Sequence, residues 1–454
     1  MCTEAFAFLL KQREQRMVNF EKLIPKEILI LIERMEGLGY EAWLVGGAVR
    51  DALLEKRSLD FDIAVNATPA QMLQSLSDYY KVIPTGLKYG TVTILINQHI
   101  NAQVTTYRSE NGYSDARHPD TVEYITNIES DLSRRDFTIN ALAWNPKLGL
   151  LDNFNGICDL YHGIIRTVGD AAQRFDEDPL RILRALRFSS TLEFSLEKTT
   201  LEAARKFKDK LKLVSPERIA DEWDQLLKGK DWLKVIERYK DILAILIPYI
   251  EDINANQIQK YIENYHRCKE IITSKKVSDD IIMTLHHVIV ANLCNASVHN
   301  VKASLMKLRY SRQFQIFTVT VYSLLKDVKV LLSLRRFDIS PAVMSRETWK
   351  ILEKYGYESV NLLLEYSVCF AELKGDNLLA FRNFVLDFET GGLPLSCKDL
   401  CVDGSDVIDI TGYGEGEIIG VVLEQLRQEV ISGRVANSRR GQIEWLETYR
   451  LDES

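Results

Sequence analysis

The spacing of hydrophobic residues divides the chain into a strand-rich part and a helical part. Between about residues 25 and 170, short apolar runs bounded by turn residues predict strands, in the segments WLVGGAVRD, DFDIAV, GTVTILI, AQVTTYR, TVEYI and GIIRTVG. Residues 26–38 predict a helix before the first strand. From about residue 170 onward, apolar residues recur at helical spacing and strand-like patterns nearly vanish. The pattern therefore predicts the α+β class, with an N-terminal head of mixed sheet and helices followed by all-helical parts.

Composition and charge describe an ordinary globular protein. Hydrophobic residues make up 46% of the 454 and charged residues 27%, which argues against a disordered chain. At roughly 100–200 residues per domain, this length suggests several domains. The formal net charge of −7 at first sight disfavours a nonspecific polyanion binder, although a basic face can exist within a negative total.

Cysteine spacing and hydropathy bear on the cellular compartment. The seven cysteines are widely spread, and the closest pair, Cys397 and Cys401, lacks the second pair that a zinc site needs, so we expect scattered reduced thiols. The N-terminus has only a short apolar run with early acidic residues, which makes a poor signal peptide. No segment reaches the roughly 18 consecutive apolar residues of a membrane span. These features predict a cytoplasmic protein with no membrane association.

A glycine pair and an Asp-x-Asp motif give the sharpest chemical signal. Gly46 and Gly47 let the backbone turn tightly and approach a phosphate, at the start of a helix that carries Arg50 on its first turn. Twelve residues separate Gly47 from Asp60, and Asp60 and Asp62 project from one face of a predicted strand. Two neighbouring carboxylates repel one another unless a cation neutralises them, and Mg²⁺ shares such oxygen ligands with substrate phosphates. We therefore predict that Asp60 and Asp62 are catalytic and bind Mg²⁺.

This arrangement resembles the signature of the nucleotidyltransferase superfamily that includes DNA polymerase β. In that superfamily a third carboxylate often lies on a neighbouring strand. Residues 102–106 predict the corresponding strand, and they offer Gln103 where related sequences usually show Glu. A glutamine side chain accepts hydrogen bonds and coordinates weakly, but it cannot act as a base. We therefore expect the two aspartates to suffice.

The segment RRDFTINA is a second candidate cluster. Arg135 can neutralise a triphosphate, and Asp136 and Asn140 can position a ribose hydroxyl. Phe137 and Ile139 suit packing against a core. Taken alone, the segment is equally well explained as a helix N-terminus with ordinary surface charges.

A third cluster, EDPLRILRALRF, predicts a helix whose first turn contains Pro179. Arg181, Arg184 and Arg187 recur every three residues along one side of this helix. Three crowded guanidinium groups repel one another unless an anion runs past them, so a triphosphate is a reasonable ligand.

Asp178 and Arg181 form a separate hypothesis, because three residues apart on a helix they share a face. Cytosine shows an N4 donor beside an N3 acceptor, and adenine shows an N6 donor beside N1. A carboxylate and a guanidinium can match both patterns, whereas guanine and uracil present the wrong order. A protein template that selects C and A is one interpretation, and a salt bridge at the helix cap is the other.

Several motifs follow one another in a fixed order: GGAVRD, DFD, the loop from Tyr107 to Arg117, RRDFTINA, EDPLRILRALRF and SPERIADE. Together, over about residues 40–230, they resemble the bacterial-type (class II) tRNA nucleotidyltransferase and poly(A) polymerase family, and most of all its CCA-adding enzymes. The helical remainder is similar in character and length only, apart from residues 433–437, which resemble the family's closing helix.

The resemblance implies an enzyme that adds C, C and A to the 3′ end of tRNA from CTP and ATP. The 3′-hydroxyl of tRNA would attack the α-phosphate and release pyrophosphate. The implied parts are an N-terminal extension at 1–24, a catalytic head at 25–168, a nucleotide-selecting neck at 169–230, a tRNA-binding helical body at 231–390 and a helical tail at 391–454. Residues 109–120 would form the mobile loop that helps to switch from C to A addition.

The resemblance also implies residue roles. Nucleotide contacts would come from Gly47, Arg50, Arg135, Asp178, Arg181, Arg184 and Arg187, and Mg²⁺ would be held by Asp60 and Asp62. Glu217, Arg218 and Glu222 match the next motif, where helix capping and ion pairs within the neck are the favoured interpretation. Candidate phosphate contacts with tRNA are Lys302, Lys307, Arg309, Arg312, Arg335, Arg336, Arg434, Arg439 and Arg440.

Two alternatives stay open. The first is an A-adding enzyme or poly(A) polymerase of the same family, since the same motifs serve both. The second is a catalytically inactive RNA-binding protein on this scaffold, against which the intact Asp60 and Asp62 argue. Many longer family members carry a His-Asp phosphohydrolase domain, but here His286 and His287 are followed by Val288, so we expect no phosphatase activity. No protein partner can be identified.

Overall fold

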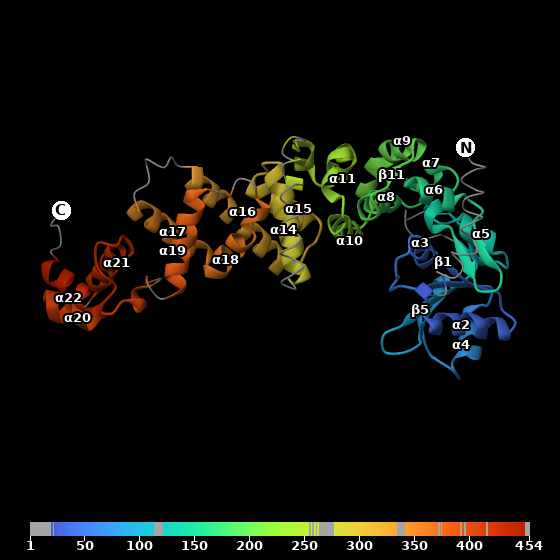
Figure 1. Cartoon of the computed structure of the whole chain (residues 1–454), viewed down its shortest axis with the longest axis horizontal. Helices are drawn as coiled ribbons and strands as arrows, with labels where there is room; N and C mark the ends of the chain where they lie inside the picture. The colour runs from blue at the N-terminus through green and yellow to red at the C-terminus, as the bar shows by residue number, and fades with distance from the viewer. Residues whose placement is uncertain are drawn as a thin grey trace. The chain divides into compact units, whose positions relative to one another are not determined.

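The computed structural model divides the chain into two compact units, Met1–Pro248 and Tyr249–Ser454 (Figure 1). It describes residues 20, 22–112, 121–253, 256, 258, 259, 261, 262, 277–333, 341–370, 373, 375–390, 393, 394, 396–414 and 416–449. Over these residues the strands all lie in the first unit, and the second unit is helical. The predicted α+β class, with a mixed-sheet head followed by helices, is confirmed. The finer division into head, neck, body and tail stays a prediction.

A seven-stranded mixed sheet forms the centre of the first unit, with the strand order β3-β4-β5-β2-β1-β8-β9. Its strands are β1 (Ala42–Val45), β2 (Asp62–Val65), β3 (Lys81–Gly86), β4 (Thr91–Leu95), β5 (Asn101–Thr106), β8 (Ala143–Asn145) and β9 (Gly149–Leu151). Strands β2 and β5 run parallel, and the other neighbours are antiparallel. Two smaller pairs are β6 (Arg108–Asn111) with β7 (Thr121–Tyr124), and β10 (Ile164–Ile165) with β11 (Ser195–Leu196).

Alternating apolar and polar residues give this sheet one buried face and one polar face. On β4, Val92 and Ile94 are buried, whereas Thr91 and Thr93 are partly exposed. Strand β5 repeats the pattern, because successive side chains point to opposite faces of a sheet. The polar face thus remains available for a site.

The helices of the first unit are α2 (Lys26–Gly37), α3 (Gly47–Leu53), α4 (Pro69–Leu76), α5 (Ile128–Ser133), α6 (Gly156–His162), α7 (Ala171–Glu177), α8 (Leu180–Leu192), α9 (Lys198–Phe207), α10 (Pro216–Leu227), α11 (Trp232–Arg238) and α12 (Lys240–Leu243). Helix α2 coincides with the predicted first helix, and α2 and α4 both pack against the sheet (Figure 1). Short 3₁₀ turns are η1 (Leu87–Tyr89), η2 (Thr138–Asn140) and η3 (Lys208–Leu213), with η4 (Pro248–Asp252) where the units meet in sequence.

Helix α8 packs closely against α10 and the turn that follows it, where Ser190 of α8 meets Gly229, two residues after α10 ends. A Cβ atom on Gly229 would lie only 2.0 Å from the Ser190 hydroxyl oxygen, so a side chain there would force the helices apart. The Ser190 hydroxyl donates to the Leu226 carbonyl at 2.7 Å, and Leu226 is buried. This contact fixes α10 beside the arginine-bearing helix α8.

The helices of the second unit are α14 (Asp279–Leu293), α15 (Val298–Lys307), α16 (Arg312–Ser333), α17 (Pro341–Tyr355), α18 (Tyr357–Glu365), α19 (Asp376–Glu389), α20 (Gly404–Thr411), α21 (Glu417–Ile431) and α22 (Arg439–Thr448), with 3₁₀ turns η5 (Ser367–Cys369) and η6 (Cys397–Asp399). The last three helices share a small apolar core that includes Val407, Leu426 and Leu446. Within the described part of the chain, no helix combines the length and apolar character that a bilayer crossing requires.

The cysteines differ in state. Cys158, Cys294, Cys397 and Cys401 are not in disulfide bonds, whereas Cys369 is disulfide-bonded. The expectation of scattered reduced thiols is therefore wrong at Cys369, which lies buried in the second unit. Sequence spacing did not indicate this bond because spacing carries no information on which cysteines the fold brings together.

Candidate active site

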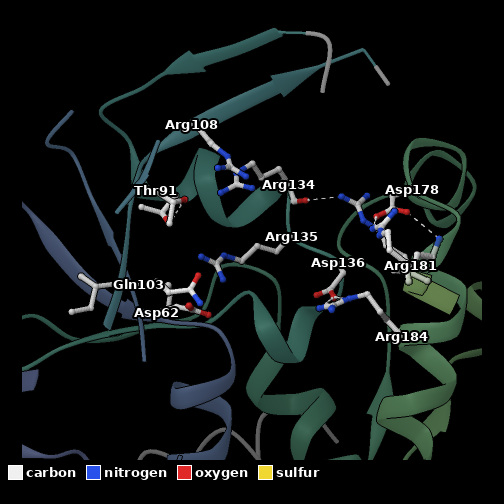
Figure 2. A pocket seen from close by; sticks show the side chains of 15 residues that line it. Asp62, Thr91, Gln103, Arg108, Arg134, Arg135, Asp136, Asp178, Arg181 and Arg184 are labelled. Carbon is white, nitrogen blue, oxygen red and sulfur yellow. Dashed lines mark hydrogen bonds and ion pairs between the residues drawn. The ribbon is translucent and has the colours of Figure 1, made fainter. Parts of the chain in front are cut away.

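A cavity of about 430 Å³ opens on the polar face of the sheet. Its lining from the strands and the segment after α5, called the head wall here, consists of Val45, Asp62, Ile63, Thr91, Gln103, Thr105, Arg108, Arg134, Arg135 and Asp136. Its lining from α8, α10 and the turn before α8, called the neck wall, consists of Asp178, Leu180, Arg181, Arg184 and Arg218. Figure 2 shows these two sets of side chains pointing toward one another. With six arginines against three aspartates, this lining favours an anionic ligand.

The sheet supplies the acidic part of the head wall. Asp62 is the first residue of β2, in register with Gln103 on the parallel strand β5, and both line the cavity. Asp60 lies two residues before the strand begins and does not line the cavity. The prediction that both aspartates stand on one strand is therefore wrong for Asp60. The intervening Phe61 is buried, and its carbonyl accepts the backbone N–H of Gln103 at 2.9 Å, which fixes the strand entrance.

The glycine turn lies against the same corner of the cavity. Gly46 has φ +72°, a left-handed conformation that glycine adopts without strain, and it precedes α3. A Cβ atom on Gly46 would lie 3.0 Å from the guanidinium of Arg135 and 3.8 Å from the carboxylate of Asp62. The missing side chain therefore leaves room for Arg135 to reach the Asp62 region.

The carboxylates suit a hard divalent cation. The side chain of Asp62 is exposed, but the protein packed around it displaces water and raises its pKa. The charge of Arg135 opposes this rise, and the charge of Asp60 adds to it. A bound cation would relieve the cost of an ionised carboxylate in this setting. Two carboxylates leave the remaining coordination positions to phosphate oxygens and water, as Mg²⁺ sites commonly do. Among the described residues, no cluster of three or more acidic, histidine or cysteine side chains forms a further metal site.

One buried carboxylate holds the arginines of the head wall. Asp131, on α5, is 1% exposed and accepts from Arg134 at 2.7 and 3.0 Å. Arg135 donates to the other oxygen of Asp131 at 3.4 Å. Burial alone would raise the pKa of Asp131, but the charges of Arg134 and Arg135 outweigh it and lower the pKa below its usual value.

Asp136 joins the two walls. Its Oδ2 accepts two hydrogen bonds from Arg184 of α8, at 2.6 and 2.8 Å, and its Oδ1 accepts from Asn140 at 3.1 Å. Burial would raise the pKa of Asp136, but Arg184 and the hydrogen bond from Asn140 lower it to about 2. Asn140 in turn accepts from Arg50 at 2.8 Å, and Arg50 also pairs with Asp51 at 2.7 Å.

The turn before α8 places Asp178 in the neck wall. Its Oδ1 accepts the backbone N–H of Leu180, the first residue of α8, at 3.0 Å. Asp178 itself is extended and precedes the helix, so the prediction that it shares a helix face with Arg181 is wrong. Its Oδ2 accepts from Arg218 of α10 at 2.8 Å. Arg181, only 9% exposed, donates to Glu177 at 2.7 Å and to the carbonyl of Arg134 at 3.4 Å, a contact drawn in Figure 2.

Buried ion pairs support the neck wall from behind. Glu222 of α10 is 8% exposed and lies 3.5 Å from Arg184 and 3.2 Å from Arg187. The guanidinium of Arg187 also lies over the ring of Phe188, 4.4 Å from its centroid. These contacts agree with the interpretation that Glu222 holds the neck together.

Of the nine residues given catalytic or nucleotide-binding roles, the structure gathers five in the cavity: Asp62, Arg135, Asp178, Arg181 and Arg184. Asp136 and Gln103, the other candidates named from the sequence, line it as well. Asp60, Gly47, Arg50 and Arg187 do not line it. Gly47 begins α3, and Arg50 and Arg187 are occupied by their pairs with Asp51 and Glu222. Helical spacing placed the three arginines of α8 on one side, but it could not show that Arg187, one turn further along, faces Glu222.

Sequence reasoning did not assign Thr91, Thr105, Arg108 and Arg218 to the cavity lining. In the sequence, the two threonines indicated only a strand. In the structure, their hydroxyls share a hydrogen bond of 3.0 Å between β4 and β5. Arg218 stood in a matched motif, but its contact with Asp178 spans 40 residues of sequence.

Other predicted features lie away from the cavity or outside the described residues. Of the segment 109–120, residues 113–120 are outside the described residues, as are Arg335, Arg336 and most of the segment 1–24. His286 and His287 are buried within α14. Three of the basic candidates for RNA contact meet acidic side chains of their own unit: Arg434 with Glu429, Arg439 with Asp406 and Arg440 with Glu444.

Comparison with known families assigns most of the first unit. The family model described as the poly(A) polymerase head domain matches residues 42–166. A second, described as a probable RNA- and SrmB-binding site of polymerase A, matches residues 193–253. The head wall of the cavity falls within the first match. On the neck wall, Arg218 falls within the second match, and the other residues lie between the two matches.

Relatives cover nearly the whole chain. The CCA-adding enzyme of Ligilactobacillus salivarius is 30% identical over 434 residues, or 94% of this chain and 96% of the relative. That of Streptococcus thermophilus is 31% identical over 92% of this chain and 94% of the relative. The solved CCA-adding enzyme of Thermotoga maritima in complex with tRNA shares the fold, with a TM-score of 0.66 and 22% identity over 96% of this chain and 98% of that one. The chain therefore belongs to the family of bacterial-type tRNA nucleotidyltransferases and poly(A) polymerases that contains the CCA-adding enzymes.

Proposed function

We propose that this chain adds C, C and A to the 3′ end of tRNA, using CTP and ATP and releasing pyrophosphate. The observation that carries the proposal is one cavity bounded by Asp62 on one wall and by Asp178 and Arg181 on the other. The wall with Asp62 suits nucleotidyl transfer, and the wall with Asp178 and Arg181 suits recognition of a base. Similarity to CCA-adding enzymes over more than nine-tenths of the chain supports this assignment.

In this proposal Asp60 and Asp62 hold Mg²⁺. When bound, the ion supplies positive charge that lowers the pKa of the attacking 3′-hydroxyl and stabilises the leaving pyrophosphate. Arg135 extends over the Gly46 turn toward Asp62 and neutralises the triphosphate. Gln103 orients ligands by hydrogen bonding and takes no proton.

The remaining residues bind the nucleotide. Asp136 and Asn140 position the ribose, and Arg184, already paired with Asp136, fixes their orientation. Gly47 contributes through its backbone. Arg50 and Arg187 support the site from behind, because they pair with Asp51 and Glu222 and do not line the cavity.

Base selection falls to Asp178 and Arg181. The Asp178 carboxylate accepts the exocyclic amine of cytosine or adenine, and the Arg181 guanidinium donates to the adjacent ring nitrogen. Guanine and uracil are rejected because each leaves a buried polar group without a partner. Asp178 lies just before α8 and Arg181 is its second residue, so acceptor and donor lie at the N-terminal end of this helix.

We further propose the division of labour into a catalytic head (25–168), a selecting neck (169–230), and a body (231–390) and tail (391–454) that grip tRNA. The supporting observation is that the cavity belongs to the first unit, while solved relatives of the same fold are described in complex with tRNA, CTP and ATP. A cytoplasmic location is part of the proposal, since tRNA and both nucleotides are available there.

One assay tests the function. The full chain is incubated with Mg²⁺ and a tRNA transcript that lacks CCA, with CTP alone, ATP alone, or both. Two additions with CTP and a third only when ATP is present support CCA addition. Extension only of transcripts already ending in CC indicates an A-adding enzyme, and long A tails indicate a poly(A) polymerase. Unextended tRNA that is nevertheless bound would identify an inactive RNA-binding protein.

A further inference from the structure

Behind the head wall lies a carboxylate that does not itself line the cavity. Asp131 is 1% exposed and meets three cavity arginines at once. One oxygen accepts from the Arg134 side chain and from the backbone N–H of Arg108 at 3.3 Å, and the other accepts from Arg135 at 3.4 Å. Half of the six arginines in the lining therefore contact a single buried side chain.

Local sequence explains how one residue can do this. Arg134 and Arg135 follow Asp131 by three and four positions, and α5 ends at Ser133. Residues at these spacings share one side of a helical turn, so both guanidiniums return toward the same carboxylate. Figure 2 shows Arg135 extending below Arg134 toward Asp62.

The anchoring has a physical consequence for binding. A free arginine side chain loses up to about 2 kcal/mol of rotamer freedom when a ligand immobilises it. Guanidiniums that are already held lose less, so preorganisation increases affinity without adding a contact. The arginines also keep Asp131 ionised despite burial, since their charges lower its pKa. The anchor thus persists at neutral pH.

We propose that Asp131 is a positioning residue for the polyphosphate of the incoming nucleotide, acting through Arg134 and Arg135 and leaving base selection untouched. The inference rests on the proposed function, because it names how that site holds its triphosphate. It separates Asp131 from Asp178, whose side chain accepts hydrogen bonds from Leu180 and Arg218 of the neck wall.

The test measures binding of two probes to the full chain without tRNA and without divalent cations, so that the aspartates of the metal site do not contribute. Tripolyphosphate reports on the arginines, and cytidine reports on the base-selecting pair. Asp131→Asn keeps the side-chain shape and removes the charge. The matched control is Glu129→Gln, which removes one charge from an exposed position on the same helix.

We expect Asp131→Asn to weaken tripolyphosphate binding about tenfold, the usual scale of a lost charged hydrogen bond, with cytidine binding and Glu129→Gln unchanged. Equal losses for both probes would mean general structural damage and would overturn the inference, as would unchanged tripolyphosphate binding. If wild type binds neither probe nor CTP, the proposed function itself fails instead.

Two further experiments test the positioning role of Asp131 if the Asp131→Asn variant folds poorly. Asp131→Glu retains the charge but moves it by one methylene, so tripolyphosphate binding should weaken less, and cytidine binding should hold. A double-mutant cycle of Asp131→Asn with Arg134→Lys should show less than additive losses, because the two act as one unit. Strict additivity, or a Glu variant with wild-type affinity, contradicts the positioning role.

Discussion

The head wall and the neck wall of the cavity are both rich in arginine, but they hold their guanidiniums differently. Arg134 and Arg135 of the head wall are neighbours in sequence and share one carboxylate, Asp131. On the neck wall, Arg181 also pairs locally, with Glu177. Two other neck-wall arginines form long-range pairs: Arg218 with Asp178 across 40 residues of sequence, and Arg184 with Asp136 across 48. A locally anchored pair can present charge to a phosphate whatever the base. A long-range pair fixes one helix against another and therefore holds its donors and acceptors in a set orientation. Recognition of a base needs such fixed hydrogen-bond geometry in addition to charge.

The largest expected effect comes from the acidic corner of the head wall. If the proposed function holds, Asp62→Ala should reduce CMP and AMP incorporation on the order of 10³-fold or more, because the proposed metal ligand and several kcal/mol of transition-state stabilisation would be lost. Asp60→Ala should act in the same way while tRNA binding stays intact. Single-turnover incorporation together with filter binding of tRNA measures both.

The matched control for these variants is Asp78→Ala, an exposed carboxylate of the same unit, which should incorporate at wild-type rate. Near-normal incorporation by Asp60→Ala would show that Asp62 alone holds the ion. That result would agree with the position of Asp60 outside both β2 and the cavity lining.

The next effect concerns the neck wall and changes selectivity more than rate. Asp178→Asn should reduce the preference for CTP and ATP over UTP and GTP by about 10- to 10²-fold, since one good bidentate contact discriminates by about 1–3 kcal/mol. Competition assays with all four nucleotides measure the ratio. Asp176→Asn, exposed on α7, is the control. An Asp178 variant with unaltered selectivity would remove this residue from the template and leave it as a helix cap.

The contact between the walls predicts a dependence of stability on pH. Arg184 and Asn140 hold the pKa of Asp136 at about 2, below the usual value of 3.8. The stabilisation is therefore complete above about pH 4 and is lost as the pH falls toward 2, and it amounts to about 2 kcal/mol. Urea unfolding of wild type and Asp136→Asn at pH 6, 4 and 3 should show a difference that shrinks with acid. A constant difference would mean that Asp136 does not titrate in this window.

Much of the first unit could be predicted from sequence because its signals are local. The Gly46 turn, the strand that begins at Asp62 and the hydrogen bond from Leu180 to Asp178 each depend on residues within a few positions of one another. The periodic threonines of β4 indicated a strand in the same way. Predictions of this kind need no knowledge of which elements meet.

What sequence could not give are contacts between distant segments. Arg50 was expected at the phosphate, but it pairs with Asn140, 90 residues away. Arg218 was expected to support the neck, and its contact with Asp178 also places it in the cavity. The sequence shows Asp131 three residues before Arg134, a spacing that is also common in surface ion pairs. Only the burial of Asp131 in the structure distinguishes this pair from such a surface pair.

The smallest effect separates two neighbours on the head wall. Gln103 lies in register with Asp62 and lines the same cavity, but an amide neither takes a proton nor binds a cation strongly. Gln103→Ala should therefore lower incorporation by less than about tenfold, the scale of one hydrogen bond. Thr93→Ala, on the same face of the sheet, is the control, and steady-state rates at varied Mg²⁺ concentration give the comparison. A loss as large as that of Asp62→Ala would mean that the amide oxygen is an essential ligand, and the acidic corner would then need three side chains to bind its ion.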